Sequence, residues 1–222
     1  MTHTLHRTKN VSGGLKEYVV FSMAAQGYND KGSAEKLKDI LKILLKHDPV
    51  NIGDDNIGGI HTGETIEGIL AHAGTKSYMA AVYTERVNAL EALRELKAAD
   101  LGMPVVVTGN REETFDMLRE IGMAPHTVNL SLGYFGKMEK LPPPEVLDIT
   151  TMCGHGMVCS DHVRYVIRQV TAGKMTPREA ALDLAKPCTC AMFNPERAAH
   201  IISSVTGKPS DTTTGSGEGG KA

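Results

Sequence analysis

All four cysteines of this 222-residue chain lie in two short segments of its last third. Cys153 and Cys159 belong to the segment MCGHGMVCSDHV, and Cys188 and Cys190 to the segment KPCTCAMF. Thiolates bind soft metals and iron–sulfur clusters, and they also act as nucleophiles and redox groups. Since every cysteine sits in a loop marked by glycine or proline, we predict that they share one site, rather than serving as apolar core side chains.

The cysteine spacing favours an iron–sulfur cluster over zinc. Structural zinc sites usually use pairs separated by about two to four residues, whereas five residues separate the first pair here and one residue the second. Spacings in iron–sulfur proteins vary more widely. We therefore predict a cluster of the [4Fe–4S] type, with zinc as the alternative metal. The predicted ligands are Cys153, Cys159, Cys188 and Cys190.

His155 lies between the first two cysteines and is the candidate catalytic residue. An imidazole titrates near neutral pH, so beside a metal it can move protons to and from a substrate. A cluster with one open iron acts as a Lewis acid on a small molecule, which suits a lyase. A cluster with four cysteine ligands carries electrons, as in an oxidoreductase, or stabilises structure.

Two other functions fit the same cysteines. A zinc ion could pin the cysteine segments to the rest of the fold in a non-catalytic binding module. Alternatively, the pair Cys153 and Cys159, or the pair Cys188 and Cys190, could work as a thiol–disulfide redox centre, although the sequence has no C-x-x-C motif.

A glycine-rich segment, GDDNIGGIHTGE at residues 53–64, is a candidate for the substrate side of the site. Its glycines allow a ligand to approach the backbone closely. Aspartate and glycine are also common in loops for structural reasons alone. The candidate substrate residues are Asp54, Asp55, His61 and Thr62.

The elements that would position these residues alternate between strand and helix. This alternation predicts an α/β fold with a mainly parallel, Rossmann-like or flavodoxin-like sheet and helices on both faces. Ligands of such sheets bind where strands end and loops enter helices. Apolar runs predict strands at residues 18–23, 49–53, 76–84, 103–109, 126–133 and 145–150, and periodic apolar faces predict helices at 33–45, 64–73, 85–102 and 110–122.

The cysteines themselves are expected on a C-terminal helical hairpin. Helices are predicted after Ser160 and Thr176, the second with a capping box, and a final helix starts at Asn194-Pro195. Each cysteine pair then precedes a helix N-terminus, whose free N–H groups stabilise thiolates. We expect a flexible N-terminus at 1–15, an α/β domain at 16–150, the cysteine-bearing segment at 151–205 and a disordered tail at 206–222.

Composition limits the partners. The formal net charge of −2 and an aromatic content of 5% give no basis for nucleic acid binding. No apolar run approaches the roughly 20 residues of a membrane span, and the polar N-terminus lacks a signal-peptide pattern. We expect a cytoplasmic protein, where thiols stay reduced. Its expected partner is a small-molecule substrate or a redox partner protein, and the composition is compatible with a homo-oligomer.

Overall fold

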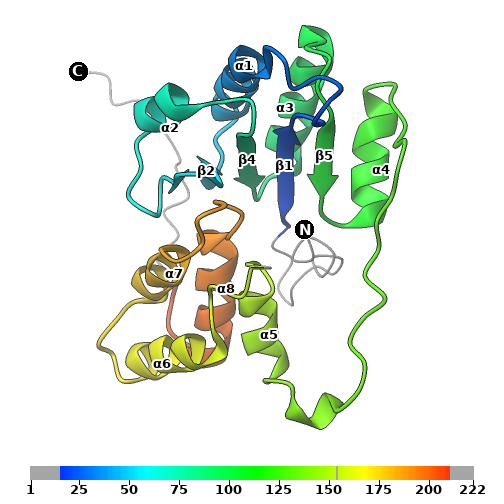
Figure 1. Cartoon of the computed structure of the whole chain (residues 1–222). Helices are drawn as coiled ribbons and strands as arrows, with labels where there is room; N and C mark the ends of the chain where they lie inside the picture. Colours follow the sequence, from blue (N-terminus) through cyan, green and yellow to red (C-terminus); the bar gives the residue numbers. More distant parts are fainter. Residues whose placement is uncertain (1–15, 154, 211–222) are drawn as a thin grey trace, which may run out of the picture.

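The computed structural model describes residues 16–153 and 155–210. These residues form a five-stranded sheet with helices around it (Figure 1). The predicted flexible N-terminus and most of the predicted tail lie outside the described residues. In sequence order the elements are β1 (Tyr18–Met23), α1 (Ser33–Leu45), β2 (Asn51–Asp54), β3 (Gly58–Gly59), α2 (Ile66–His72), β4 (Tyr78–Tyr83), α3 (Arg86–Ala99), β5 (Val105–Thr108), α4 (Arg111–Glu120), the 3₁₀ turn η2 (Met138–Lys140), α5 (Pro144–Thr150), α6 (Ser160–Thr171), α7 (Pro177–Ala185) and α8 (Pro195–Thr206).

The prediction of a mainly parallel, Rossmann-like or flavodoxin-like sheet is wrong. The strand order is β3-β2-β4-β1-β5, and every pair of neighbours is antiparallel. Strand β4 lies between β1 and β2, so α1 connects two strands that are not neighbours. This split β-α-β arrangement has the same alternation of strands and helices along the sequence as a parallel sheet. The pattern that we used therefore does not separate the two topologies.

Two of the predicted strands are also wrong. Residues 145–150 belong to helix α5, which starts after the proline run and buries Val146 and Ile149, three residues apart. A six-residue apolar run has too few residues for its period to separate strand from helix. Residues 126–133 form no strand in the sheet and are almost entirely exposed.

Local capping signals locate several helices correctly. Asn110 accepts a hydrogen bond from the backbone N–H of Glu113 at the start of α4. Thr176 and Glu179 form the predicted capping box of α7. Asn194 caps α8 in the same way as Asn110 caps α4. These signals hold because they depend only on the residues around one helix end.

The sheet is buried on both faces, and alternate residues of each strand face opposite layers. Tyr18 and Val20 of β1 pack with α1, α3 and α4 in one apolar core. Val19 and Phe21 pack in a second core with residues of α5, α6, α7 and α8. The helices that carry the cysteine loops therefore cover one face of the sheet. Every helix in the described ranges is too short or too polar to cross a lipid bilayer.

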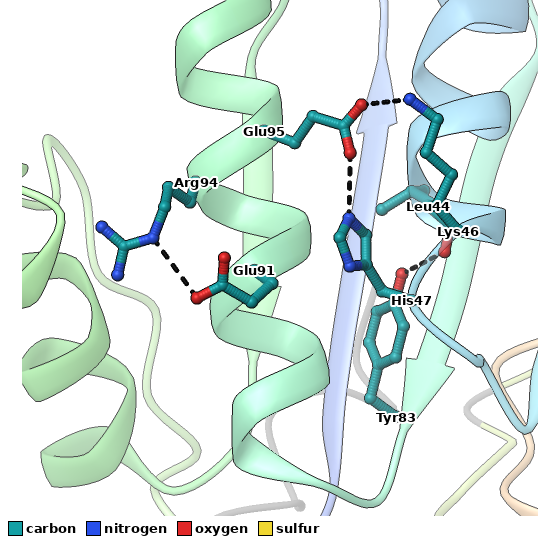
Figure 2. A network of polar contacts seen from close by, with 7 residues as sticks. All are labelled: Leu44, Lys46, His47, Tyr83, Glu91, Arg94 and Glu95. Carbon is teal, nitrogen blue, oxygen red and sulfur yellow. Dashed lines mark hydrogen bonds and ion pairs between the residues drawn. The ribbon is translucent and has the colours of Figure 1, made fainter.

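A polar network joins α1 to α3 on the other face of the sheet (Figure 2). The Glu95 carboxylate accepts from Lys46 and, at 3.0 Å, contacts Nε2 of His47. These contacts, led by the hydrogen bond from Lys46, lower the pKa of Glu95. Tyr83 of β4 donates to the carbonyl oxygen of Leu44 at 2.7 Å, so the end of α1 is fixed to the sheet as well.

A buried ion pair joins the first strand to the last helix. Nη1 of Arg197 in α8 lies 2.7 Å from Oε2 of Glu17, just before β1, and the two residues are only 5% and 7% exposed. The pair connects residues near opposite ends of the described sequence. Removing one member leaves the other charge in a buried setting, which costs more than losing a surface pair.

We expect Arg197→Met to lower the free energy of unfolding by about 3 kcal/mol, because it leaves the Glu17 carboxylate without its buried cation. The double variant Glu17→Gln/Arg197→Met should recover a large part of that loss. Urea denaturation measures both. The control is Arg178→Met, which breaks the exposed pair with Glu196 and should cost less than about 1 kcal/mol. Equal losses in the two single variants would contradict a special role for the buried pair.

Candidate functional site

Three of the four cysteines, Cys153, Cys188 and Cys190, lie in the apolar core between the sheet and helices α5 to α8. We call this group the three-thiol cluster. Their exposed fractions are 2%, 0% and 2%. The sulfurs of Cys188 and Cys190 are 3.7 Å apart, and Cys153 lies close enough to Cys188 to alter the pKa of both thiols. Cys188 is thus the central thiol of the three.

Backbone N–H groups of neighbouring residues lower the pKa of the two outer thiols of the cluster. Those of Met157, His155 and Val158 act on Cys153, and that of Met192 acts on Cys190. Such donors stabilise a thiolate, and they also tune a metal bound to it.

The cluster favours negative charge on its two outer sulfurs. The hydrogen bond with Cys188, followed by the backbone donors, lowers the pKa of Cys153 to about 5. A hydrogen bond with Cys188, with help from Met192 and His155, lowers the pKa of Cys190 to about 6. The same two contacts, together with burial, raise the pKa of Cys188. The contacts among the three thiols thus make Cys188 the thiol that holds its proton most tightly.

The fourth cysteine lies differently. Cys159 is the N-cap residue of α6, and its thiol is exposed. Among the described residues, the sulfur contacts join the other three cysteines and do not include Cys159. Its role as a ligand stays a prediction.

The glycine-rich segment lies against the loop that carries Cys188 and Cys190. The Cβ of Ala191 lies so close to the β2–β3 hairpin that a Cβ placed on Gly53 or Gly59 would come within 2.7 Å or 2.6 Å of it. Ala191 itself has a left-handed φ of 55°, which an alanine adopts only where its surroundings impose it. The two glycines therefore let the loop with Cys188 and Cys190 rest directly on the sheet.

Two further contacts hold this loop in place. Asn51 of β2 donates from Nδ2 to the carbonyl oxygen of Phe193 at 2.8 Å, and both residues are buried. The hydroxyl of Tyr78 contacts the sulfur of Met192 at 3.4 Å. Asn51 and Ala191 belong to no recognisable sequence motif, so the sequence alone does not indicate their role.

Asp54 and Asp55 lie at the end of β2, next to His155. Oδ1 of Asp54 accepts from the backbone N–H groups of Asn56 and Tyr78, at 3.1 Å and 3.2 Å. Burial, and then the charge of Asp54, raise the pKa of Asp55 to about 6, while the neighbouring His155 opposes this rise. The sheet thus brings a carboxyl pair from the glycine-rich segment towards the cysteine loops.

His155 is exposed and connects the two groups. It lies close enough to Cys190 and to Asp55 to alter the pKa of that thiol and of that carboxyl. A thiol, an imidazole and a carboxyl in this order can activate a nucleophile or transfer a proton. His155 thus lies near both Asp55, a predicted substrate residue, and Cys190, a predicted cluster ligand.

The other two candidate substrate residues have structural partners. Nε2 of His61 lies 2.9 Å from the carbonyl oxygen of Val50. The hydroxyl of Thr62 bonds with the backbone of Gly59. Both side chains therefore stabilise the turn after β3.

Metal binding to the cluster requires some rearrangement. Within residues 16–153 and 155–210, no group of three or more His, Cys, Asp or Glu side chains is arranged to hold a metal ion directly. The sulfurs of Cys188 and Cys190 are 3.7 Å apart, and they would have to separate to bind different irons of a cluster. No protein-family model matches the sequence, and no curated protein or solved structure is similar enough to count as a match.

We expect Gly59→Ala to lower the free energy of unfolding by about 1–3 kcal/mol. The new Cβ would lie 2.6 Å from both the Cβ of Ala191 and the carbonyl oxygen of Ile52, so the cysteine loop must move. The rate at which a thiol reagent modifies the buried cysteines should rise as well. Gly74→Ala is the matched control, because its nearest neighbour is 3.9 Å away. Unchanged stability and thiol reactivity in Gly59→Ala would show that the close approach is not needed.

We expect Asp55→Asn to stabilise the protein at pH 8 but not at pH 4. The folded state raises the pKa of Asp55 to about 6, so it binds the proton more tightly than the unfolded state. The wild type therefore loses this contribution as the pH rises from near 4 through 6. With solvent screening the gain at pH 8 is about 1 kcal/mol. Denaturation at both pH values measures it, and an equal effect of Asp55→Asn at pH 4 and pH 8 would contradict it.

Proposed function

We propose that Cys153, Cys188 and Cys190 hold an iron–sulfur cluster, and that the protein is a metalloprotein acting on a small molecule beside it. The observation that carries the proposal is the three-thiol cluster, in which two loops more than 30 residues apart in the sequence bring buried, mutually contacting sulfurs together. Thiolates are the preferred ligands of iron–sulfur clusters.

The chemistry of the donor set fits a cluster. The three sulfurs are soft ligands, and neighbouring backbone N–H groups lower the pKa of two of them, Cys153 and Cys190. Hydrogen bonds to sulfur and exclusion of water are the main means by which a protein tunes a cluster's potential. Burial of the three-thiol cluster therefore supports the proposal on grounds independent of the cysteine spacing.

Three ligands rather than four suit catalysis. When bound, a cluster with one iron free of cysteine supplies a Lewis acid for a substrate oxygen. His155 is exposed beside Cys190 and would move the proton. Asp55 would orient His155 from the sheet side. This arrangement favours a lyase over an electron carrier. Cys159 would complete a four-cysteine site only if its loop brought it to the cluster.

A zinc site is the second candidate, and one distance favours it. Two sulfurs bound to the same tetrahedral ion at about 2.3 Å lie about 3.8 Å apart, close to the 3.7 Å between Cys188 and Cys190. In a [4Fe–4S] cluster each cysteine binds a different iron, so these two sulfurs would have to move further apart.

A thiol redox centre is the third candidate. The contact between Cys188 and Cys190, together with the thiolate character of Cys190, would support oxidation of this pair to a disulfide. Because only Thr189 separates the two cysteines, such a disulfide would close a small ring.

All three candidate functions require thiols that are kept reduced, and we therefore propose that the protein is cytoplasmic. We also propose that its partner is a small molecule or a redox protein rather than nucleic acid.

We expect protein purified without oxygen to be brown and to contain iron and acid-labile sulfide. Cys188→Ser should lose the metal, because a hydroxyl is a poor ligand for a soft metal. Cys159→Ser, its matched control, should keep most of it, because this thiol is exposed. His155→Ala should also keep the metal, while any turnover falls by about 10²–10⁴-fold.

Metal analysis of the same proteins separates the candidates. A colourless protein with equimolar zinc supports the second candidate. A metal-free protein that gains a Cys188–Cys190 disulfide on mild oxidation supports the third. If Cys188→Ser keeps the metal while Cys159→Ser loses it, the three-thiol cluster is not the binding site.

A further inference from the structure

The segment between α4 and α5, residues 123–138, is a long apolar stretch on the surface, which we call the strap. Figure 1 shows it leaving α4 and running outside the body of the protein before it turns back to α5. Leu132 is 87% and Phe135 79% exposed. Seven of the exposed large apolar side chains fall within these residues: Met123, Val128, Leu130, Leu132, Tyr134, Phe135 and Met138. Clusters of exposed apolar side chains mark interaction surfaces rather than ordinary surface.

The strap has the composition of a strand. Val128, Leu130 and Leu132 alternate with polar residues, which is the period of a strand with one apolar face. The backbone of residues 124–130 makes no backbone hydrogen bond to any other described residue. An extended, apolar segment whose backbone is not paired in a sheet is the usual template for pairing with another polypeptide.

The strap also carries no charge that would oppose such pairing. Residues 124–136 contain no Asp, Glu, Lys or Arg, in a protein in which 23% of the residues are charged. Exposed edges that must stay unpaired normally carry charges, prolines or bulges as protection. Within the alternating part of the strap, residues 127–132, neither a charge nor a proline occurs.

We propose that the strap is a dimer interface, in which the straps of two copies of this protein pair as antiparallel strands around a two-fold axis. Centred on Leu130, the alternation is self-complementary: Leu130 faces Leu130 of the second copy, and Val128 faces Leu132. A two-fold interface requires this self-complementarity, because the same patch serves both copies. A second copy is also the one partner present wherever the protein is.

The size of the exposed surface agrees with such a dimer. Seven large side chains that are between 39% and 87% exposed offer roughly 500–600 Å² of apolar surface per copy. A standard interface buries about 800 Å² per partner. The backbone of the paired straps and the adjoining surface of α5 would supply the remainder. The interface is separate from the three-thiol cluster and does not depend on the function proposed for it.

The test is the molar mass in solution, measured by light scattering and sedimentation over a range of concentrations. The full-length protein should have twice the monomer mass of 23.9 kDa. Leu130→Asp places two like charges opposite each other across the axis. Leu132→Asp places a charge opposite the apolar side chain of Val128 in the second copy. Each should weaken the dimer by about 100-fold or more. Because both side chains are exposed in the monomer, the variants should fold normally.

Val87→Asp is the matched control, because Val87 on α3 is 58% exposed and far from the strap in sequence. It should leave the dimer intact. A wild-type protein that stays monomeric at high concentration would overturn the proposal, and so would species larger than a dimer, because a two-fold interface closes at two copies. Dimers that survive both aspartate variants would also overturn it.

Discussion

The contact between Ala191 and the two glycines of the β2–β3 hairpin is the constraint on which the candidate site depends. Residues with side chains at Gly53 or Gly59 would collide with Ala191 and with neighbouring backbone. Because both positions are glycine, the loop carrying Cys188 and Cys190 lies against the sheet, where it can meet Cys153 from the preceding loop. The left-handed φ of Ala191 is a local cost that the surrounding contacts, including the bond from Asn51 to Phe193, offset.

The sequence predicts the features that depend on neighbouring residues, and it does not predict the contacts between residues far apart in the sequence. The helices capped by Asn110, Thr176 and Asn194 are predictable, because a cap involves neighbouring residues only. The neighbours of each strand are not, since β1 pairs with the distant strands β4 and β5, and a split β-α-β sequence alternates as a parallel one does. The cysteine segments stood out by residue type. Their contact with the glycine-rich segment depends on how distant strands pair in the sheet, so no local sequence pattern predicts it.

The protonation and metal-binding properties of the three-thiol cluster have one physical origin. Backbone N–H groups and the contacts with Cys188 lower the pKa values of Cys153 and Cys190, and thiolates are the form that binds metals. A metal ion or cluster would balance the negative charge of thiolates in this buried place. The same electrostatics would make Cys190 reactive towards oxidants or electrophiles whenever it is not coordinated. The candidate functions are therefore alternative uses of one arrangement of donors and charges.

The placement of α5 to α8 on one face of the sheet has a consequence for synthesis. A ribosome makes a protein from its N-terminus, so all the strands exist before these helices do. The face formed by Val19, Phe21, Tyr78, Ala80 and Val82 has no partner from α5 to α8 until the last third of the protein has been made. During that interval the nascent protein presents an apolar sheet surface of the kind that chaperones bind. Translation of α8 then completes the second core and the Glu17–Arg197 pair together, so a protein truncated before α8 would lack both.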